Sequence, residues 1–183
     1  MKKEKNFELY LRAFELTDLE KLNALRNDDE AFLYTCGNKF FISKEYDRKW
    51  IEDKIFNNQY QIYLSICLSD TKELIGYICI IDIDYRNRKA QWGGINIDKN
   101  SSGKGYATKA ASLMIKFVFE ELGFNKLYGY VIESHSVSIR MLEKLGFVKE
   151  GLIHDFVYKK NQFHNAYFVS LLKDEYNIKL NGK

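Results

Sequence analysis

Three consecutive β-type segments, joined by short polar turns, constrain the fold of this 183-residue chain more than any other feature. They span residues 59–68, 73–85 and 89–98 and are rich in β-branched and aromatic residues. The turn-like sequences SDTK and RNRK separate them. The sequence therefore predicts an antiparallel meander at the centre of the chain.

The pattern changes on both sides of this meander. Before it, residues 7–14 alternate as a strand does, and two helices with capping residues at their starts are expected at 17–25 and 42–56. After it, the sequence predicts helix, strand, helix and two final strands at 104–121, 125–133, 136–145, 147–158 and 163–173. The last two strands are joined by a turn at Asn161, a residue type that tolerates positive φ. This order predicts a single α/β domain, 1–183, with a mixed sheet.

The composition fits a globular protein and excludes several classes. Hydrophobic residues make up 46% and charged residues 29% of the chain. The formal charge is +3, with both signs interspersed, so nothing indicates a nucleic acid partner. The sequence shows no signal peptide and no apolar run of the ~20 residues that span a bilayer, which predicts a cytoplasmic protein without a membrane partner. Cys36, Cys67 and Cys79 lack metal-ligand spacing, so we expect reduced, buried thiols and no metal.

Two adjacent glycines, 93–94, interrupt the last segment of the meander. Ala90 and Trp92 share one parity, whereas Ile95 and Ile97 have the other, so strict alternation breaks at the glycines. A β-bulge would restore both apolar pairs to their environments and leave a backbone N–H outside the ladder. A simple bend explains the two glycines equally well.

A second pair of glycines, Gly103 and Gly105, lies where strand gives way to helix. The unsatisfied N–H groups and the dipole of a helix start attract anions, and Lys104 adds positive charge. The stretch SSGKGYAT lacks the first glycine and the spacing of a Walker A loop. It also does not follow the first strand of a βαβ unit, as a dinucleotide-binding loop does. The sequence therefore predicts an anion site of another type.

Two motifs together resemble the GNAT acyltransferases. Residues 102–107 occupy the pattern Q/R-x-x-G-x-G/A of that family's pyrophosphate loop, and SIRMLEKLGFVKEG at 138–151 is similar to its S-I-R-x-x-E-K-L-G-F followed by E-G. Similarity extends over LYLRAFELTDLEKL and LIGYICIIDIDYRNRKAQWG, and it is greatest to the RimJ/RimL-type N-acetyltransferases. The resemblance implies a GNAT fold: a mixed, mostly antiparallel sheet of six to seven strands, splayed between strands four and five and flanked by about four helices.

The resemblance also implies acetyl-CoA as co-substrate, without a metal. The pyrophosphate would lie on the loop amides, and the pantetheine would run beside the fourth strand like an extra strand. Ser102 replaces the family's usual Gln or Arg, and His135 replaces its usual Asn. The implied cofactor-binding residues are Ile95, Ile97, Ser102, Gly103, Lys104, Gly105, Tyr106, Ala107, His135 and Ser138.

The implied reaction is direct attack of a primary amine on the thioester through a tetrahedral intermediate. By analogy the N–H of Ile95 would stabilise the oxyanion. Leu142 occupies the position of the tyrosine that often acts as the general acid in this family, and a leucine side chain has no proton to donate. Ser138 is then a candidate proton donor, or only a helix cap.

The general base is not evident from the sequence. Many relatives carry Glu where this chain has Gln91, and an amide cannot act as a base. Glu133, His135 and a water-mediated route remain as candidates. We take Ile95, Glu133 and Ser138 as the catalytic residues and assign His135 to cofactor binding, with a catalytic role for its imidazole left open.

The acceptor side is the least determined part of the sequence. Residues that fall in the regions shaping this site in relatives, and that fit core packing as well, are Trp92, Tyr34, Trp50, Phe40 and Phe41. The acceptor could be a protein N-terminus, an amino-sugar nucleotide or a polyamine. The acids Asp28, Asp29 and Glu30 would suit a polyamine, but residues 27–29 fit a helix terminus and loop equally well. Because Gln91 and Leu142 stand where relatives carry Glu and Tyr, a non-catalytic protein that binds and senses acetyl-CoA is the alternative function. A homodimer is expected by analogy with relatives.

Overall fold

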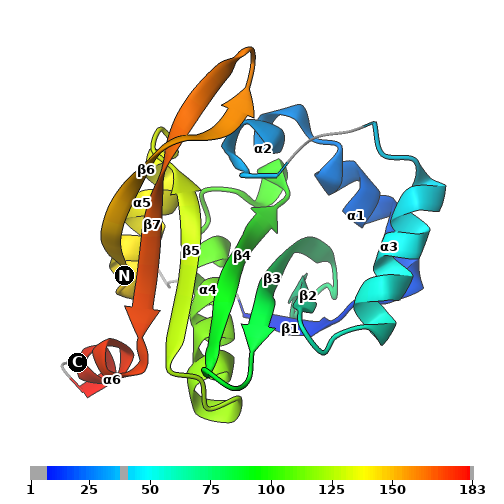
Figure 1. Cartoon of the computed structure of the whole chain (residues 1–183). Helices are drawn as coiled ribbons and strands as arrows, with labels where there is room; N and C mark the ends of the chain where they lie inside the picture. The colour runs from blue at the N-terminus through cyan, green and yellow to red at the C-terminus, as the bar shows by residue number, and fades with distance from the viewer. Residues whose placement is uncertain (1–7, 38–40, 182–183) are drawn as a thin grey trace, which may run out of the picture.

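The computed structural model describes residues 8–37 and 41–181, and the side chains up to residue 178 (Figure 1). Its centre is one seven-stranded sheet in the order β1-β2-β3-β4-β5-β7-β6. The strands are β1 (Leu9–Ala13), β2 (Ile62–Leu68), β3 (Leu74–Asp84), β4 (Lys89–Ile97), β5 (Lys126–Ile132), β6 (Val148–Lys159) and β7 (Gln162–Leu172). Every neighbouring pair is antiparallel except β4 and β5, which run parallel. The expected meander and mixed sheet are confirmed.

Six α-helices flank the sheet in the described part of the chain, two more than the sequence predicts. They are α1 (Leu19–Arg26), α2 (Asp29–Tyr34), α3 (Lys44–Phe56), α4 (Tyr106–Lys116), α5 (Ser136–Leu145) and α6 (Lys173–Asn181). The additional ones are the short α2 and the C-terminal α6. A π-helical turn, Phe117–Glu121, continues α4.

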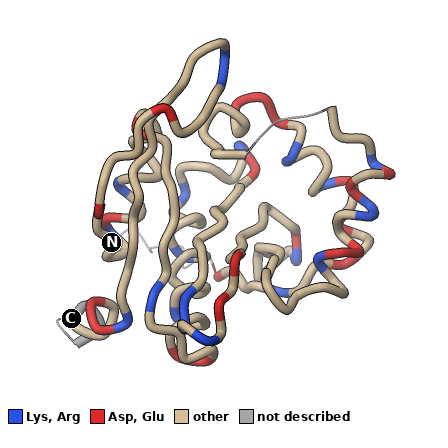
Figure 2. The backbone as a smooth tube through the Cα atoms, viewed as in Figure 1, with Lys and Arg blue, Asp and Glu red and all other residues tan. Residues whose placement is uncertain are grey.

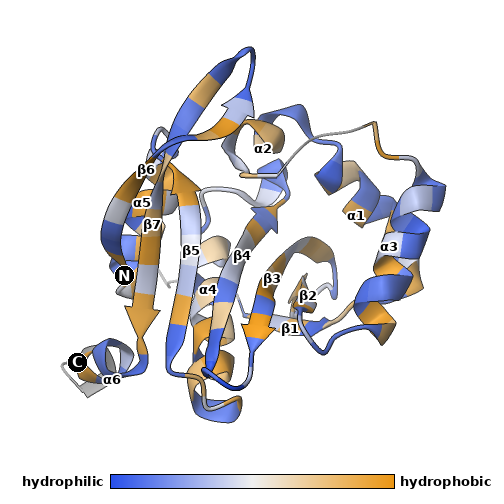
Figure 3. Cartoon of the chain, in the orientation of Figure 1, coloured by the Kyte–Doolittle hydropathy of each residue, from blue (hydrophilic) through white to orange (hydrophobic). Residues whose placement is uncertain are grey.

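Two hydrophobic cores lie on opposite faces of the sheet. The larger core includes α4, whose Ala110 and Ala111 are completely buried, so that this helix lies close against the strands. The smaller core packs α1 and α3 against β2 and β3 around Leu22 and Ile51. Figure 3 shows hydrophobic residues along the central strands and α4. The two cores thus hold β2 and β3 from both sides.

The hairpin between β6 and β7 closes with a two-residue turn. Lys160 and Asn161 have φ angles of 47° and 62°. Two consecutive positive φ angles are typical of the type I′ turn that matches strand twist. The expected positive φ at Asn161 is confirmed. This hairpin projects beside α2 (Figure 1).

The cysteines form no disulfide in the described part of the chain, and the charged residues form no single-sign block. All three cysteines are free; Cys67 and Cys79 are buried as expected, but Cys36 is exposed, because the short segment after α2 lies at the surface. Charged residues of both signs are interspersed along the chain (Figure 2). Within the described ranges, no helix has the length and apolar character needed to cross a membrane.

Candidate active site

A β-bulge lies in the middle of β4. Ile80 is opposite Trp92 and Cys79 is opposite Gly94, so Gly93 is the extra residue. A Cβ on Gly93 would lie 2.6 Å from Cys79 Sγ, and Gly94 has a φ of 106°. Both positions therefore require glycine, for different reasons. The bulge predicted from the broken alternation is confirmed.

The parallel pair β4 and β5 separates after a short contact. The two strands pair over three residues only, ending at Gln91 opposite Tyr128. A Cβ on Gly129 would lie 3.2 Å from both Cβ and O of Trp92, so the backbones are still very close at this point. Beyond this point β4 continues to Ile97 and β5 to Ile132, but the two strands no longer pair with each other. We call the resulting V-shaped space the β4–β5 opening.

The backbone N–H groups of Ile95 and Ile97 face this opening. The N–H of Asp98 donates to Ile75 O on β3 at 2.8 Å. Successive N–H groups of a strand point to opposite sides, and residues 94–97 are in continuous register with β3. The groups at Ile95 and Ile97 therefore point away from β3, where a ligand could accept their hydrogen bonds.

The facing edge of β5 is exposed to the same space. The N–H of Glu133 donates to Asn165 O on β7 at 2.9 Å, so by the same alternation the backbone groups of Tyr130 and Ile132 point away from β7. The thiol of Cys36 lies 3.8 Å from Tyr130 O. That contact brings the segment after α2 to the edge of the opening.

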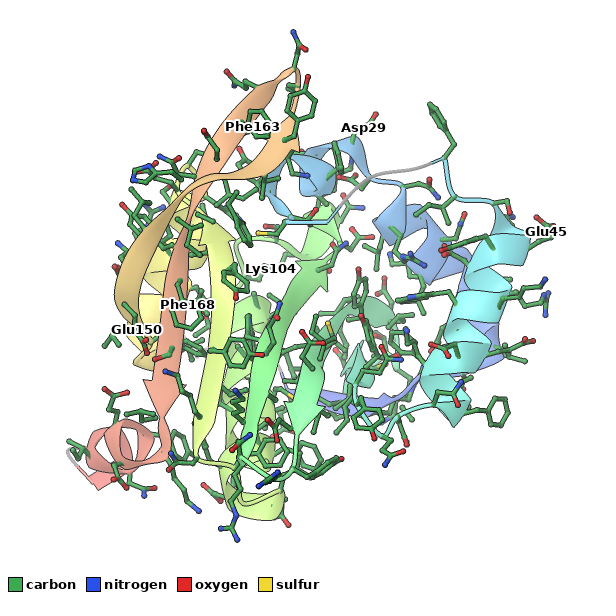
Figure 4. All side chains as sticks on the ribbon, in the orientation of Figure 1. Asp29, Glu45, Lys104, Glu150, Phe163 and Phe168 are labelled. Carbon is green, nitrogen blue, oxygen red and sulfur yellow. The ribbon has the colours of Figure 1, made fainter. Side chains whose placement is uncertain are left out.

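The glycine-rich loop follows β4 directly. Gly103 and Gly105 adopt left-handed conformations with φ of 73° and 82°, and α4 begins at Tyr106, two residues later than predicted. Within the described residues, the N–H groups of Gly103, Lys104 and Gly105 donate no backbone hydrogen bond. Lys104 is exposed (Figure 4), and its Nζ donates to Asn100 O at 2.8 Å. The loop thus offers amides and a positive charge to an anion.

His135 and Tyr34 come together from distant parts of the chain. His135 is the residue before α5, and its ring stacks on that of Tyr34 from α2, with centroids 4.5 Å apart and an interplanar angle of 23°. Burial lowers the pKa of His135 below its usual value of 6.5, so the imidazole is neutral at pH 7. Ser138 lies half-buried in the first turn of α5.

Glu133 points toward β7. Its carboxylate accepts a hydrogen bond from Asn165 Nδ2 at 3.0 Å and contacts the Tyr167 hydroxyl at 3.5 Å. Both partners belong to β7, which borders β5 on the side opposite β4. The carboxylate is therefore directed away from the β4–β5 opening.

Trp92 lies in the larger core, and Trp50 is partly buried against the smaller one. Trp92 is only 7% exposed and packs against Phe147, while Trp50 packs against Phe14 and beneath the Arg26 guanidinium, 3.8 Å from its ring centroid. These placements favour packing over acceptor binding for both. Phe41 is fully exposed, and Phe40 lies outside the described residues.

The contact between Cys36 and Tyr130 was missed by sequence reasoning. The two residues are 94 positions apart and belong to no motif, so no local signal could have joined them. In the described ranges no group of three or more His, Cys, Asp or Glu side chains could hold a metal ion.

Comparison with known proteins identifies the family. Residues 8–148 match the family model described as an acetyltransferase (GNAT) domain. The chain belongs to the GNAT acetyltransferase family. A relative from Bacillus licheniformis, the uncharacterized N-acetyltransferase p20, is 33% identical over 92% of this GNAT chain and 94% of its own length. The Escherichia coli spermidine N(1)-acetyltransferase is 28% identical over 91% of this chain and 87% of its own length. This GNAT protein is accordingly an acyltransferase.

A solved structure supports the same fold. The spermidine N-acetyltransferase of Vibrio cholerae, in complex with CoA and spermine, superposes on this GNAT chain with a TM-score of 0.86. It is 24% identical and covers 92% of this chain and 98% of that one. At this identity the likeness establishes the architecture, namely the GNAT sheet with its single parallel pair.

Proposed function

We propose that this enzyme transfers acetyl from acetyl-CoA to a primary amine of a polyamine. The observation that carries the proposal is the β4–β5 opening, which has outward-facing amides along one edge and the glycine loop where that edge ends. Pantetheine carries amides of its own, which pair with strand edges in the manner of β-augmentation. The pyrophosphate group is an anion that fits the amides of Gly103 to Gly105.

In the proposed reaction, the amine nitrogen attacks the thioester carbonyl carbon and forms a C–N bond. The carbonyl oxygen becomes an oxyanion that accepts a hydrogen bond from the N–H of Ile95, next to the bulge. The intermediate then collapses with cleavage of the C–S bond. The CoA thiolate leaves and takes up a proton, while the amine nitrogen loses one.

Of the candidate bases, the structure favours His135 over Glu133. The imidazole is neutral at pH 7 and lies beside Tyr34 at the edge of α2, whereas the carboxylate of Glu133 is held toward β7. A neutral imidazole can accept the proton that the amine loses. Ser138, in the next turn, stays the proposed proton donor for the thiolate.

His135→Asn is expected to lower kcat about tenfold or more, since general-base groups contribute roughly 10²–10⁴-fold, while acetyl-CoA affinity stays within about twofold. Because burial lowers the pKa of His135, its contribution should be retained at neutral pH and lost as the pH falls through the lowered pKa. Steady-state kinetics from pH 5 to 8, with binding measured by calorimetry, provides the check. Glu133→Gln is the matched variant, and a larger loss there than in His135→Asn contradicts the assignment.

A polyamine acceptor is supported by the surface beside α2. A shallow, open surface pocket is lined by Asp29, Glu30, Phe32 and Leu33, with Lys160 also at its wall. Two carboxylates beside apolar side chains suit ammonium groups joined by methylenes. Asp28, just before these residues, caps α2 by accepting a hydrogen bond from the N–H of Ala31 at 2.8 Å.

Thiol release against a panel of amines tests the acceptor. We expect spermidine and spermine to be acetylated at least tenfold faster than an N-terminal peptide or an amino-sugar nucleotide, a difference of ~1.4 kcal/mol. Faster turnover of the N-terminal peptide or of the amino-sugar nucleotide would contradict a polyamine acceptor and identify that amine class instead. Acetyl-CoA binding without turnover of any amine would instead support the non-catalytic sensor.

We further propose that the chain is a single domain of the RimJ/RimL type, that it works in the cytoplasm and that it forms a homodimer. The motif SIRMLEKLGFVKEG supports the subtype. Sedimentation equilibrium tests the dimer, and a monomer mass at micromolar concentration would exclude it.

A further inference from the structure

Lys159, at the end of β6, is a buried lysine that the reaction does not use. It is only 5% exposed. Its Nζ donates to Phe32 O at 2.7 Å and to Gly37 O at 3.0 Å, and it lies 3.6 Å from the centroid of the Phe32 ring. In the described ranges no carboxylate forms an ion pair with it. Its partners are two main-chain carbonyls and one aromatic face.

Such a placement is costly, and the contacts of the ammonium must offset the cost of removing it from water. Burying a charge without a counter-ion is unfavourable, and burial lowers the pKa of Lys159. Oriented carbonyls and an aromatic face compensate part of this cost. All of these partners belong to residues 32–37, which we call the acceptor-side segment.

The acceptor-side segment borders the β4–β5 opening through two further contacts. Cys36 meets the outward-facing carbonyl of Tyr130 on β5, and Tyr34 stacks on His135 at the start of α5. Figure 4 labels Asp29 on α2 and Phe163 on the hairpin at the same end of the molecule. The segment is thus fixed at the hairpin by Lys159 and at the opening by its own side chains.

We infer that Lys159 is a positioning residue for the amine acceptor: its ammonium holds residues 32–37 as a wall of the β4–β5 opening. The inference rests on the proposed function, because it assigns the wall to the acceptor. The described contacts of the segment reach β5, α5 and the hairpin, whereas the glycine loop and the β4 amides offered to acetyl-CoA lie elsewhere. Loss of the Lys159 ammonium should therefore weaken acceptor binding more than acetyl-CoA binding, which also depends on the glycine loop and the β4 amides.

Lys159→Met, which keeps a long side chain but removes the ammonium, is expected to raise the acceptor KM about tenfold. The Kd for acetyl-CoA should stay within about twofold. Lys159→Arg retains the charge and N–H donors and should recover part of the loss. Lys54→Met is the matched control, because the Lys54 side chain is 11% exposed and lies on α3, remote from the segment.

Hydrogen exchange of the amides in residues 29–37 gives a readout that needs no turnover. Exchange should accelerate in Lys159→Met and remain unchanged in Lys54→Met, with the β3 amides protected in both. Unchanged exchange in Lys159→Met, or an equal rise of the acceptor KM and the acetyl-CoA Kd, overturns the inference. If Lys159→Met does not fold, Lys159→Gln replaces it as the variant without a charge, and Lys159→Arg remains the variant that keeps the charge. A wild-type enzyme that acetylates no amine refutes the proposed function, while the exchange data still decide whether Lys159 anchors the segment.

Discussion

Gly93→Ala is expected to lower kcat about 100-fold, the loss seen when an oxyanion donor is displaced. The new Cβ would lie 2.6 Å from Cys79 Sγ and 3.3 Å from both Cys79 O and Ile81 Cγ2. At such distances the bulge must shift, and the N–H of Ile95 shifts with it. Stopped-flow or steady-state measurement of thiol release at saturating acetyl-CoA gives kcat directly.

A second substitution separates this mechanism from general damage. Cys79→Ala removes the sulfur that the new methyl group meets, so the double variant C79A/G93A should recover kcat to within about tenfold of wild type. Cys79→Ala alone should have little effect on kcat. If Gly93→Ala keeps full activity, or if the double variant is no better than the single one, the bulge does not place the oxyanion donor.

Gly105→Val is expected to raise the Kd for CoA about 30-fold, because losing one hydrogen bond to a charged phosphate costs about 2 kcal/mol. A β-branched side chain disfavours the φ of 82° at this position and would project where the loop meets the anion. Nothing within 4 Å obstructs a Cβ there, so the fold itself should survive. Isothermal titration with CoA measures the change.

Gly123→Val is the matched control for that variant. Gly123 also has a positive φ, of 66°, and open space around its Cβ position, but it lies after the π-helical turn at the other end of α4. Both variants should lose about 1–2 kcal/mol of stability from backbone strain. Only the loop variant should lose CoA affinity, and equal affinities in the two would refute the loop as the pyrophosphate site.

The parts of the site that lie on one stretch of chain were predictable from sequence. The bulge shows as a break in alternation at a Gly-Gly pair, and the loop shows as glycines before a helix. The turn at Asn161 was predicted because its residue type tolerates the conformation found. In each case a local conformational requirement selects the residue type.

Other features had no such local signal. The six-residue α2 is too short to show a helical apolar face, although Asp28 caps it. The face on which Trp92 lies depends on the position of the bulge relative to β3, which one sequence does not determine. The stack of Tyr34 on His135 and the bonds of Lys159 to residues 32–37 arise only when distant elements pack, the latter across more than 120 positions.

The close approach of Trp92 and Gly129 makes the space between the two strands a dead end. A linear molecule that lies along β4 can advance only until the main chains meet. Whichever group such a molecule carries at its tip is brought to rest beside the bulge. The shape of the sheet thus selects for reactivity at a terminus, before any side chain contributes to recognition.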